Sequence, residues 1–547
     1  MKRLSLILFL LSLTLTAMAV PARRVSKTVC LTDGSVVTVQ LRGDEAFHYW
    51  ATPDGIPMRE LENGCWEKNP ADVRTLHQSR LEQRNAIRQS RAAKVQKAMH
   101  AARAPYLSTE NSIKKGLLIL VNFKDKEMAS GEKTNEVFNQ MLNATGNPYG
   151  KNYGSVREYF RSQSYGKFDI EFDVVGPVTV SREMKYYGEN INGKEGEDKR
   201  PCEMVREACL LVDDLVDFSD YDWDGDGEVE NIYVTYAGYA EAAGAPADCI
   251  WPHQWYLSGV GKTLQLDGVT IDTYACGTEL SGSKGTTYEG IGVMCHEYSH
   301  CLGLPDFYDT SGSNFGMDCW SILDYGCYNG DGYRPAGYTA YERWFCGWME
   351  PVELTDGCFV QNMKNIEHYP EAYVIYNDKQ RAEYYLLANH QQVDWDADAY
   401  GHGLMILHVD YNEWSWYNNV VNTIASRQRM TIIPADDNLT MTSLATDLWP
   451  SRRSKTELTD SSTPAATLYN ANTDGKKFMH KPITKIRESN GAISFTFKGG
   501  GYYMDVSEVR NAAHAAPSAV YDLSGRRVQR PLRPGFYVVD GRKVYMK

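Results

Sequence analysis

Residues 296–306 combine the types and the spacing of side chains that can hold a metal ion. His296 and His300 lie four residues apart, so on a helix they project from the same face. Two imidazoles at this spacing can bind one zinc ion, and Glu297 beside the first can act as general base on a water at the metal. Gly303 permits a left-handed turn at the helix end, so Asp306 can return as a third ligand. Three protein ligands and one open position predict a catalytic zinc site that performs hydrolysis.

The residue types alone leave several alternatives to this site open. The two histidines could be partly buried residues of an ordinary amphipathic helix, and Asp309 is a weaker rival for the third ligand. A thermolysin-like site would take its third ligand from a Glu on a later helix, which Gly303 and Asp306 argue against. A serine hydrolase is disfavoured, because the chain has no Gly-x-Ser-x-Gly elbow.

Hydrophobic periodicity indicates the elements that must position these residues. We expect the motif helix at about residues 288–302 and a buried strand at Leu117–Val121. Ser155 and Glu158 have the spacing of a capping box, which predicts a helix that stops near Gly166. A helix around residues 137–142 and strands at 169–174 and 231–236 complete a mixed α and β catalytic domain, predicted over residues 105–350.

The N-terminal region has the pattern of an exported protein. A basic start, a short apolar run and the small residues Ala17-Met18-Ala19 predict a signal peptide over residues 1–19. The run is too short to span a membrane, and no later segment is long and apolar enough. We therefore expect an exported bacterial protein without a transmembrane segment, either secreted or held at the cell surface.

Residues 20–104 are predicted to form a propeptide that keeps the enzyme latent; the alternative for its basic stretch is a solvated linker helix that is not cut. Strand-like pieces at residues 35–39 and 47–50 precede a basic stretch from Arg74 to Arg103, whose spacing indicates a linker helix. Cleavage near Arg103 would then release the mature enzyme. Cys30 or Cys65 could cap the zinc of the latent form, because thiolate is a strong zinc ligand.

The last 200 residues favour β structure. Strands are expected at residues 373–376, 384–387, 404–410 and 430–433. They predict a β-rich domain over residues 351–498, shaped as a sandwich, followed by a linker of three glycines. A small β module over residues 502–547 contains a hairpin with an Asp540-Gly541 turn and is a possible sorting signal.

Composition narrows the partners of the chain. The 547 residues carry a net charge of −13, which with the absence of a basic stripe among aromatics argues against nucleic acid. Twelve cysteines in an exported chain permit disulfides, and some pairing is expected among the four near the motif, which are Cys295, Cys301, Cys319 and Cys327.

A second candidate metal site precedes the strand at residues 231–236. Gly227 stands at position six of a loop with acids at alternating positions, which resembles the first half of an EF-hand, although position twelve is Tyr233. The alternative is an acidic turn without an ion. The predicted calcium ligands are Asp222, Asp224, Asp226, Glu228 and Glu230.

The 296–306 motif resembles that of the metzincins with Asp as third ligand, and the best match is the immune inhibitor A-like family of secreted bacterial metalloproteases. The resemblance spans about residues 115–430 and includes the helix at 155–166, the loop at 222–230, Trp251-Pro252-His253 and the segment 303–309. It implies an α+β fold with a two-lobed metzincin-like zinc protease domain. It also implies His296, His300 and Asp306 as zinc ligands and peptide-bond hydrolysis as the activity.

The chain departs from the family pattern at several positions. Leu323 stands where the methionine of the metzincin turn is expected, and Ala388 and His390 replace a usual Glu and Arg. Tyr325, two residues after Leu323, occupies the place of a phenol that supports the transition state in some metzincins. The resulting hypothesis is a zinc endopeptidase that acts on extracellular proteins or peptides. The alternative is an impaired protease scaffold that serves as a secreted binding or adhesion protein.

Overall fold

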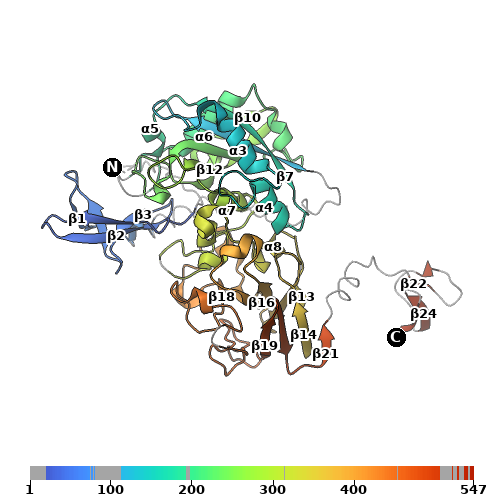
Figure 1. Ribbon diagram of the computed structural model, residues 1–547. Coiled ribbons are helices and arrows are strands. Elements are labelled where there is room, and N and C mark those ends of the chain that lie inside the picture. The colour runs from blue at the N-terminus through green and yellow to red at the C-terminus, as the bar shows by residue number, and fades with distance from the viewer. Residues whose placement is uncertain are drawn as a thin grey trace, which may run out of the picture.

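The computed structural model describes residues 20–73, 75–77, 79, 113–191, 197–312, 314–451 and 454–504, together with four short strands between residues 520 and 546. Figure 1 shows an N-terminal sheet beside a central α and β region, with a β-rich region below it and the C-terminal strands apart from the rest. The predicted signal peptide and most of the predicted basic linker helix lie outside the described residues.

The N-terminal sheet is an antiparallel five-stranded blade in the order β1-β2-β3-β4-β5. Its own small core consists of Val29, Val39, Met58 and Trp66. The expected strands at 35–39 and 47–50 are present within β2 and β3. The bounds are β1 Ser26–Cys30, β2 Val36–Gly43, β3 His48–Ala51, β4 Pro57–Glu60 and β5 Trp66–Lys68.

A second five-stranded sheet, in the order β7-β6-β8-β12-β9, carries the central region. The first four strands are parallel neighbours, and β9 pairs antiparallel with β12 at the edge. Buried apolar runs, such as Leu117–Val121 in β6, suit a sheet covered on both faces. The bounds are β6 Lys114–Asn122, β7 Ile170–Thr179, β8 Ile232–Tyr239, β9 His253–Tyr256 and β12 Thr273–Leu280, with a hairpin of β10 Leu264–Leu266 and β11 Val269–Ile271.

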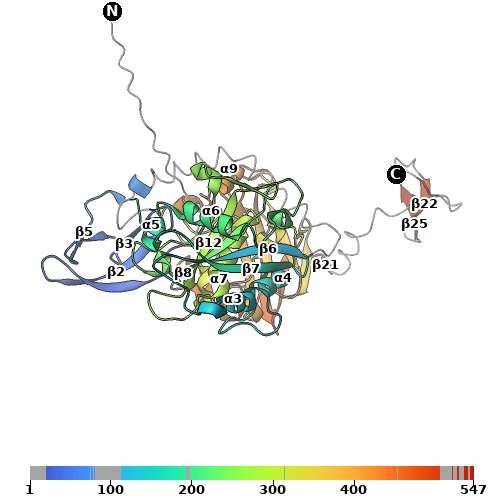
Figure 2. The ribbon, with the colours of Figure 1, turned by 90° about the horizontal axis from the view of Figure 1, so that it is seen from above.

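Helices cover both faces of this sheet. In Figure 2, α5 (Met184–Gly188) and α6 (Pro201–Val212) lie on one side, and α3 (Thr134–Asn143), α4 (Val156–Gln163) and α7 (Ile291–Cys301) lie on the other. The predicted capping box is confirmed, because the Ser155 side chain accepts from Glu158 N and the Glu158 side chain accepts from Ser155 N. The helix expected at 288–302 is α7, whose ten residues from Ile291 to His300 are all buried.

The β-rich region contains two sheets, in the orders β13-β15-β16-β17-β18 and β19-β20-β14-β21. Residues of both sheets belong to one buried cluster, which includes Tyr385 and Phe495. That shared core supports the predicted sandwich, which remains a prediction. The bounds are β13 Val352–Glu353, β14 Cys358–Met363, β15 Ala372–Tyr376, β16 Glu383–His390, β17 Gly403–Asp410, β18 Met430–Ile432, β19 Ile483–Ser489, β20 Ala492–Phe497 and β21 Tyr502–Met504, with α9 at Glu413–Tyr417.

A buried arginine joins the central region to the β-rich region. Arg343, in α8 (Ala340–Phe345), is fully buried and forms an ion pair with buried Glu367. Its guanidinium also donates to Gln163 Oε1 at 2.7 Å and to the carbonyls of Tyr338 and Ile366. A buried guanidinium is tolerated only when its N–H groups have hydrogen-bond partners. These partners come from both regions, so their contacts fix how the two regions pack together.

The C-terminal strands form a four-stranded sheet in the order β23-β22-β24-β25. The predicted hairpin is confirmed by the antiparallel pair β24 (Gly535–Val539) and β25 (Arg542–Met546), and the other two strands are β22 Val520–Tyr521 and β23 Arg527–Val528. No helix in the described part of the chain has the length and hydropathy needed to cross a bilayer.

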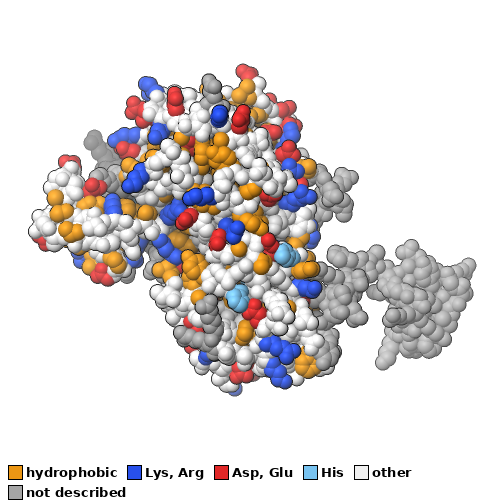
Figure 3. Space-filling view, in the orientation of Figure 1, with side chains coloured by type: hydrophobic (Ala, Val, Ile, Leu, Met, Phe, Trp, Pro, Cys, Tyr) orange, Lys and Arg blue, Asp and Glu red, His pale blue; other side chains and the backbone are white. Residues whose placement is uncertain are grey.

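The expectation about the cysteines is contradicted. All twelve cysteines are free thiols, so the expected pairing near the motif is wrong; Cys295, Cys319 and Cys327 are buried and pack as small apolar residues. On the face shown in Figure 3, basic and acidic side chains are interspersed over the described surface.

Candidate metal centre and active-site cleft

Helix α7 presents the two histidines and the glutamate of the motif to the interior. His296 and Glu297 are completely buried, and the rings of His296 and His300 lie 4.7 Å apart between centroids. The helix ends as predicted, because Gly303 has a φ of +93° and its N–H donates to the His300 carbonyl at 2.9 Å. This turn sends the chain back toward the helix face that carries the histidines.

Asp306 meets both histidines at one point. Its Oδ1 lies 3.2 Å from Nε2 of His296 and 3.2 Å from Nε2 of His300, and the two nitrogens are 3.1 Å apart. Ligand atoms around one tetrahedral zinc ion, at bond lengths of about 2.0–2.1 Å, are separated by roughly 3.3 Å. The three side chains therefore have the mutual spacing of ligands to a single small cation.

Hydrogen bonds to the far ring nitrogens decide which nitrogen faces the centre. Nδ1 of His296 bonds to the Ile322 carbonyl at 2.7 Å, and Nδ1 of His300 bonds to the Leu304 carbonyl at 2.8 Å. A carbonyl only accepts, so each Nδ1 carries the proton and each Nε2 keeps a lone pair for a metal. Burial lowers the pKa of His296, which further favours the neutral ring.

A residue of the β-rich region fixes the carboxylate of Asp306. The backbone N–H of Asp306 donates to Asn419 Oδ1 at 2.6 Å, and Asn419 Nδ2 donates to Asp306 Oδ2. The rival ligand Asp309 is engaged elsewhere, since its carboxylate accepts from Ser311 and from Asn314 N.

The segment expected to form the floor of the site lies beneath the histidines. Ile322 supplies the carbonyl that holds His296, and the Leu323 carbonyl accepts from Phe307 N at 2.8 Å. Leu323 itself is completely buried. That Leu323 takes the place of the methionine, with a side chain of similar volume, stays a prediction.

Glu297 lies beside the two histidines of the metal-ligand triangle. One of its carboxylate oxygens lies within 4.8 Å of a ring nitrogen of each histidine. Its Oε1 accepts from the backbone N–H of Val20 at 2.9 Å, whereas Oε2 is buried and accepts no hydrogen bond from the described residues. Burial, followed by the charge of Asp306, raises the pKa of Glu297 well above its ordinary value, which suits a group that must accept and release a proton.

The start of the described chain occupies this site. Val20 and Pro21 are buried; the Val20 carbonyl accepts from Trp251 Nε1 at 3.0 Å, and the Pro21 carbonyl accepts from Tyr328 Oη at 2.9 Å. We call residues 20–24 the N-terminal segment. The structure therefore brings this segment, rather than Cys30 or Cys65, against Glu297; Cys30 is exposed at the end of β1.

Tyr325 lies in the same cleft. It begins the 3-10 helix η7 (Tyr325–Gly332), and the guanidinium of Arg24 stacks 3.7 Å from its ring centroid. Burial raises the pKa of Tyr325 to about 12, so its phenol stays protonated and able to donate. A role for this phenol in the reaction remains a prediction.

The acidic loop folds around its own first aspartate. Asp222 accepts from the N–H groups of Gly225, Asp226 and Gly227, and Gly227 has a φ of +86°. Ligand atoms of Asp222, Asp224 and Asp226 lie within 4.8 Å of one another. Glu230 accepts from Trp223 N, and Glu228 pairs with Thr270 through a backbone bridge.

Some contributors to the site escape prediction from the sequence. Asn419 lies more than 100 residues after the motif, and its only local signal is an Asn in a left-handed backbone conformation, with a φ of +54°. Trp251 belongs to a segment of the resemblance, but nothing in that segment predicts its contact with Val20. Tyr328 carries no signal of its contact with Pro21. Each of these contacts depends on tertiary structure.

Comparison with known proteins decides the family of the central region. Residues 107–348 match the catalytic domain of immune inhibitor A peptidase M6. This region belongs to the immune inhibitor A family. The pre-pro-metalloprotease PrtV of Vibrio cholerae is 30% identical over 224 residues, covering 36% of this chain and 24% of the relative. Immune inhibitor A of Bacillus thuringiensis is 27% identical over 224 residues, covering 36% of this chain and 32% of the relative.

The matched residues include the three candidate metal ligands and Glu297. The match ends at residue 348, however, and the aligned part is a quarter to a third of the length of these relatives. Asn419, which holds Asp306, therefore lies outside the matched catalytic domain.

Proposed function

We propose that this chain is a secreted zinc-dependent endopeptidase of extracellular proteins or peptides, with His296, His300 and Asp306 as metal ligands. The observation that carries the proposal is the triangle of three buried ligand atoms 3.1–3.2 Å apart. Membership of a metallopeptidase family supports the same reaction. Protein substrates and release to the cell exterior follow from that family and from the predicted signal peptide.

The residues present fit a divalent cation. Two ring nitrogens with lone pairs and one carboxylate oxygen converge in a buried space, where without a cation the lone pairs would repel one another. Two nitrogens and one oxygen are also a donor set that zinc accepts.

The chemistry then divides between the metal and the protein. When bound, zinc supplies a Lewis acid that polarises the scissile carbonyl and acidifies a water molecule. Glu297 accepts the proton of the attacking water, for which its Oε2 is available, and delivers it to the departing amine. Tyr325 is proposed to donate a hydrogen bond to the carbonyl oxygen as negative charge develops on it.

The test separates metal binding from proton transfer. Glu297→Gln keeps the zinc content of the purified protein but lowers casein hydrolysis at least a hundredfold, because an amide cannot accept the proton. His300→Ala loses the zinc, as measured by mass spectrometry. Wild-type activity in Glu297→Gln would disprove the assigned base, and zinc-loaded protein without chelator-sensitive proteolysis would favour the alternative of a binding or adhesion protein.

We further propose that residues 20–104 keep the enzyme latent through the N-terminal segment. Cleavage of the predicted signal peptide after Ala19 would leave the α-amino group of Val20 beside Glu297, where a substrate must react. The unprocessed protein should hydrolyse a fluorogenic peptide slowly, and limited trypsin treatment should accelerate it. Equal rates before and after treatment would exclude this form of latency.

A calcium ion at the acidic loop is the remaining cofactor proposal. Carboxylates of Asp222, Asp224 and Asp226 are close enough to share one ion, and extracellular calcium is plentiful. Trp223, inside the loop, provides a direct test, because it can sensitise the luminescence of bound Tb³⁺. We expect this luminescence to be displaced by calcium and to be lost in Asp224→Asn; its absence from wild type would exclude the site.

A further inference from the structure

Both arginines of the N-terminal segment reach acidic partners in the cleft. Arg24 forms an ion pair with Asp318 and stacks on the Tyr325 ring. Arg23 lies 3.6 Å from Glu289 and 3.9 Å from Asp331, and its guanidinium is 5.5 Å from the Tyr328 ring centroid. The contact of Arg24 is the tighter one, because it combines a direct ion pair with close stacking.

Hydrogen bonds around Asp318 hold its side chain so that one carboxylate oxygen, Oδ2, contacts the cation. Its side chain is only 3% exposed, and its Oδ1 accepts from Cys319 N at 2.8 Å at the start of the 3-10 helix η6 (Asp318–Trp320). Asp324 clamps the loop, since its Oδ2 accepts from the N–H groups of Met317 and Asp318 at 2.8 Å each. Asp318 also has a φ of +47°, a conformation that costs energy and is retained by this clamp.

Arg24 is the only salt-bridge partner of Asp318 among the described residues. When the N-terminal segment leaves, the Asp318 carboxylate beside the Tyr325 ring remains without this cation. Leaving a charge of this kind unpaired is unfavourable, so the cleft gains affinity for a replacement cation.

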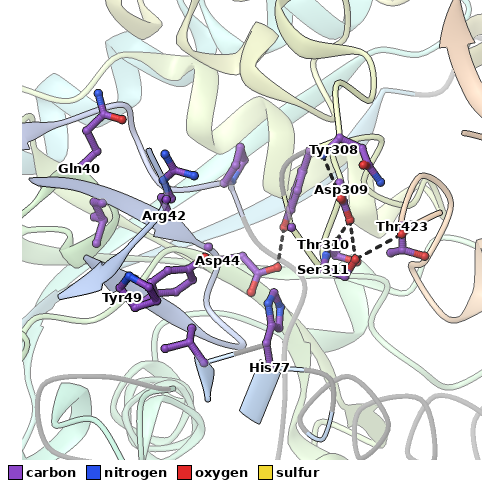
Figure 4. A pocket seen from close by; sticks show the side chains of 18 of the residues that line it. Gln40, Arg42, Asp44, Tyr49, His77, Tyr308, Asp309, Thr310, Ser311 and Thr423 are labelled. Carbon is purple, nitrogen blue, oxygen red and sulfur yellow. Dashed lines mark hydrogen bonds between the residues drawn. The ribbon is translucent and has the colours of Figure 1, made fainter. Parts of the chain in front are cut away.

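This position is only a few residues along the chain from two contacts of the candidate metal centre. Val20, four residues before Arg24, contacts Glu297, and Tyr325 lies on the same loop as Ile322, which holds His296. A large pocket continues from here, lined by Pro21, Arg24, Asp318 and Tyr325 at one end. Figure 4 shows another part of this pocket, where Tyr308 donates to Asp44, just after β2, and where Arg42 and Tyr49 also belong to the lining.

We propose that Asp318 and Tyr325 form a substrate subsite that selects an arginine or lysine side chain, and that Arg24 occupies it in the latent protein. The proposal rests on the proposed peptidase function and names the substrate class: peptides with a basic residue near the scissile bond. Asp318 binds the cationic head, and the Tyr325 face binds the flat guanidinium.

The test compares peptides that differ only in charge. After trypsin activation of the full chain, peptides selected from a library are resynthesised with citrulline, the neutral isostere, in place of arginine. We expect wild type to favour arginine over citrulline by about tenfold in kcat/KM, mainly through KM, the size of one good charge-assisted contact. Asp318→Asn should bring this ratio close to one, and asparagine tolerates the positive φ.

Asp331→Asn is the matched control. Asp331 also has a positive φ, of +57°, but its side chain is 89% exposed and it approaches Arg23 instead. This variant should keep the wild-type ratio. As a measurement that needs no variant, n-butylguanidine should inhibit wild type competitively, whereas its neutral isostere n-butylurea should not.

The outcomes separate the two proposals. If activated wild type with bound zinc cleaves no peptide, the proposed function fails. If it cleaves peptides without favouring arginine or lysine, or if Asp318→Asn keeps the preference, the subsite is wrong and Asp318 only anchors the N-terminal segment.

Discussion

Replacing Asn419 tests whether the β-rich region holds the third metal ligand. Asn419 makes two hydrogen bonds to Asp306, one to its backbone N–H and one to Oδ2 of its carboxylate. Removing partners that orient a ligating carboxylate typically lowers metal affinity by about 10–100-fold, which corresponds to roughly 1.4–2.8 kcal/mol. Because one of these two bonds reaches a charged group, we expect Asn419→Gly to fall in the upper half of that range.

Glycine is the informative replacement. At a φ of +54° glycine is unstrained, whereas alanine would add a backbone cost of about 1 kcal/mol. Zinc affinity is measured by competition with a chromogenic chelator, and kcat/KM is measured again at saturating zinc. Asn418→Ala serves as control, because that amide donates to the Trp414 carbonyl in α9. A zinc dissociation constant of Asn419→Gly within twofold of wild type would refute the assigned bracing.

Three further predictions concern latency, pH and the turn after the motif helix. Arg24→Ala should raise the activity of the unprocessed protein about fivefold to tenfold, because it removes the ion pair to Asp318. The increase is limited because the Arg24 side chain is 42% exposed, so solvent screens part of the ion-pair energy. His48 is buried 3.0 Å from Glu241. Burial lowers the pKa of His48, but the charge and hydrogen bond of Glu241, together with Asp44, raise it overall. Docking of the N-terminal sheet is therefore strongest at acid pH and weakens as pH rises through the raised pKa. Tryptic activation should therefore accelerate with pH in wild type and lose this dependence in His48→Gln. Gly303→Ala should lower the free energy of unfolding by about 1–2 kcal/mol and reduce the zinc content, because alanine disfavours the φ of +93°.

Each of these predictions has an outcome that contradicts it. Unchanged basal activity in Arg24→Ala would show that Val20 alone blocks the cleft. A pH dependence retained in His48→Gln would assign the titration to another group in that contact. Full zinc content in Gly303→Ala would mean that Asp306 reaches the metal without this turn.

Local sequence patterns predict most of the regular secondary structure. The apolar run at Leu117–Val121, the capping box at Ser155 and the hairpin at the C-terminus all appear where expected, because each depends on residues close in sequence. The sequence patterns do not predict strands in which apolar and polar residues alternate less regularly, including β9, β12 and β20. The disulfide expectation failed, because cysteine positions along the chain carry no information on which thiols meet in space.

For the candidate site, the sequence predicts the residues that lie on one helix and in the turn that follows it. The spacing of His296, His300 and Asp306 follows from helix geometry and from the φ of Gly303, so their convergence was predictable. The bracing by Asn419 and the contact of Val20 with Glu297 join positions more than 100 residues apart, and no periodicity encodes them.

The buried guanidinium of Arg343 has a practical consequence for any attempt to isolate the peptidase. The matched catalytic domain ends at residue 348, yet the acid that neutralises this cation, Glu367, lies beyond that residue. A chain truncated there would retain a desolvated positive charge without its counter-ion, a defect that costs about 3–5 kcal/mol, comparable to the whole stability margin of many domains. The end of the matched catalytic domain at residue 348 is therefore not a boundary at which this molecule can be divided.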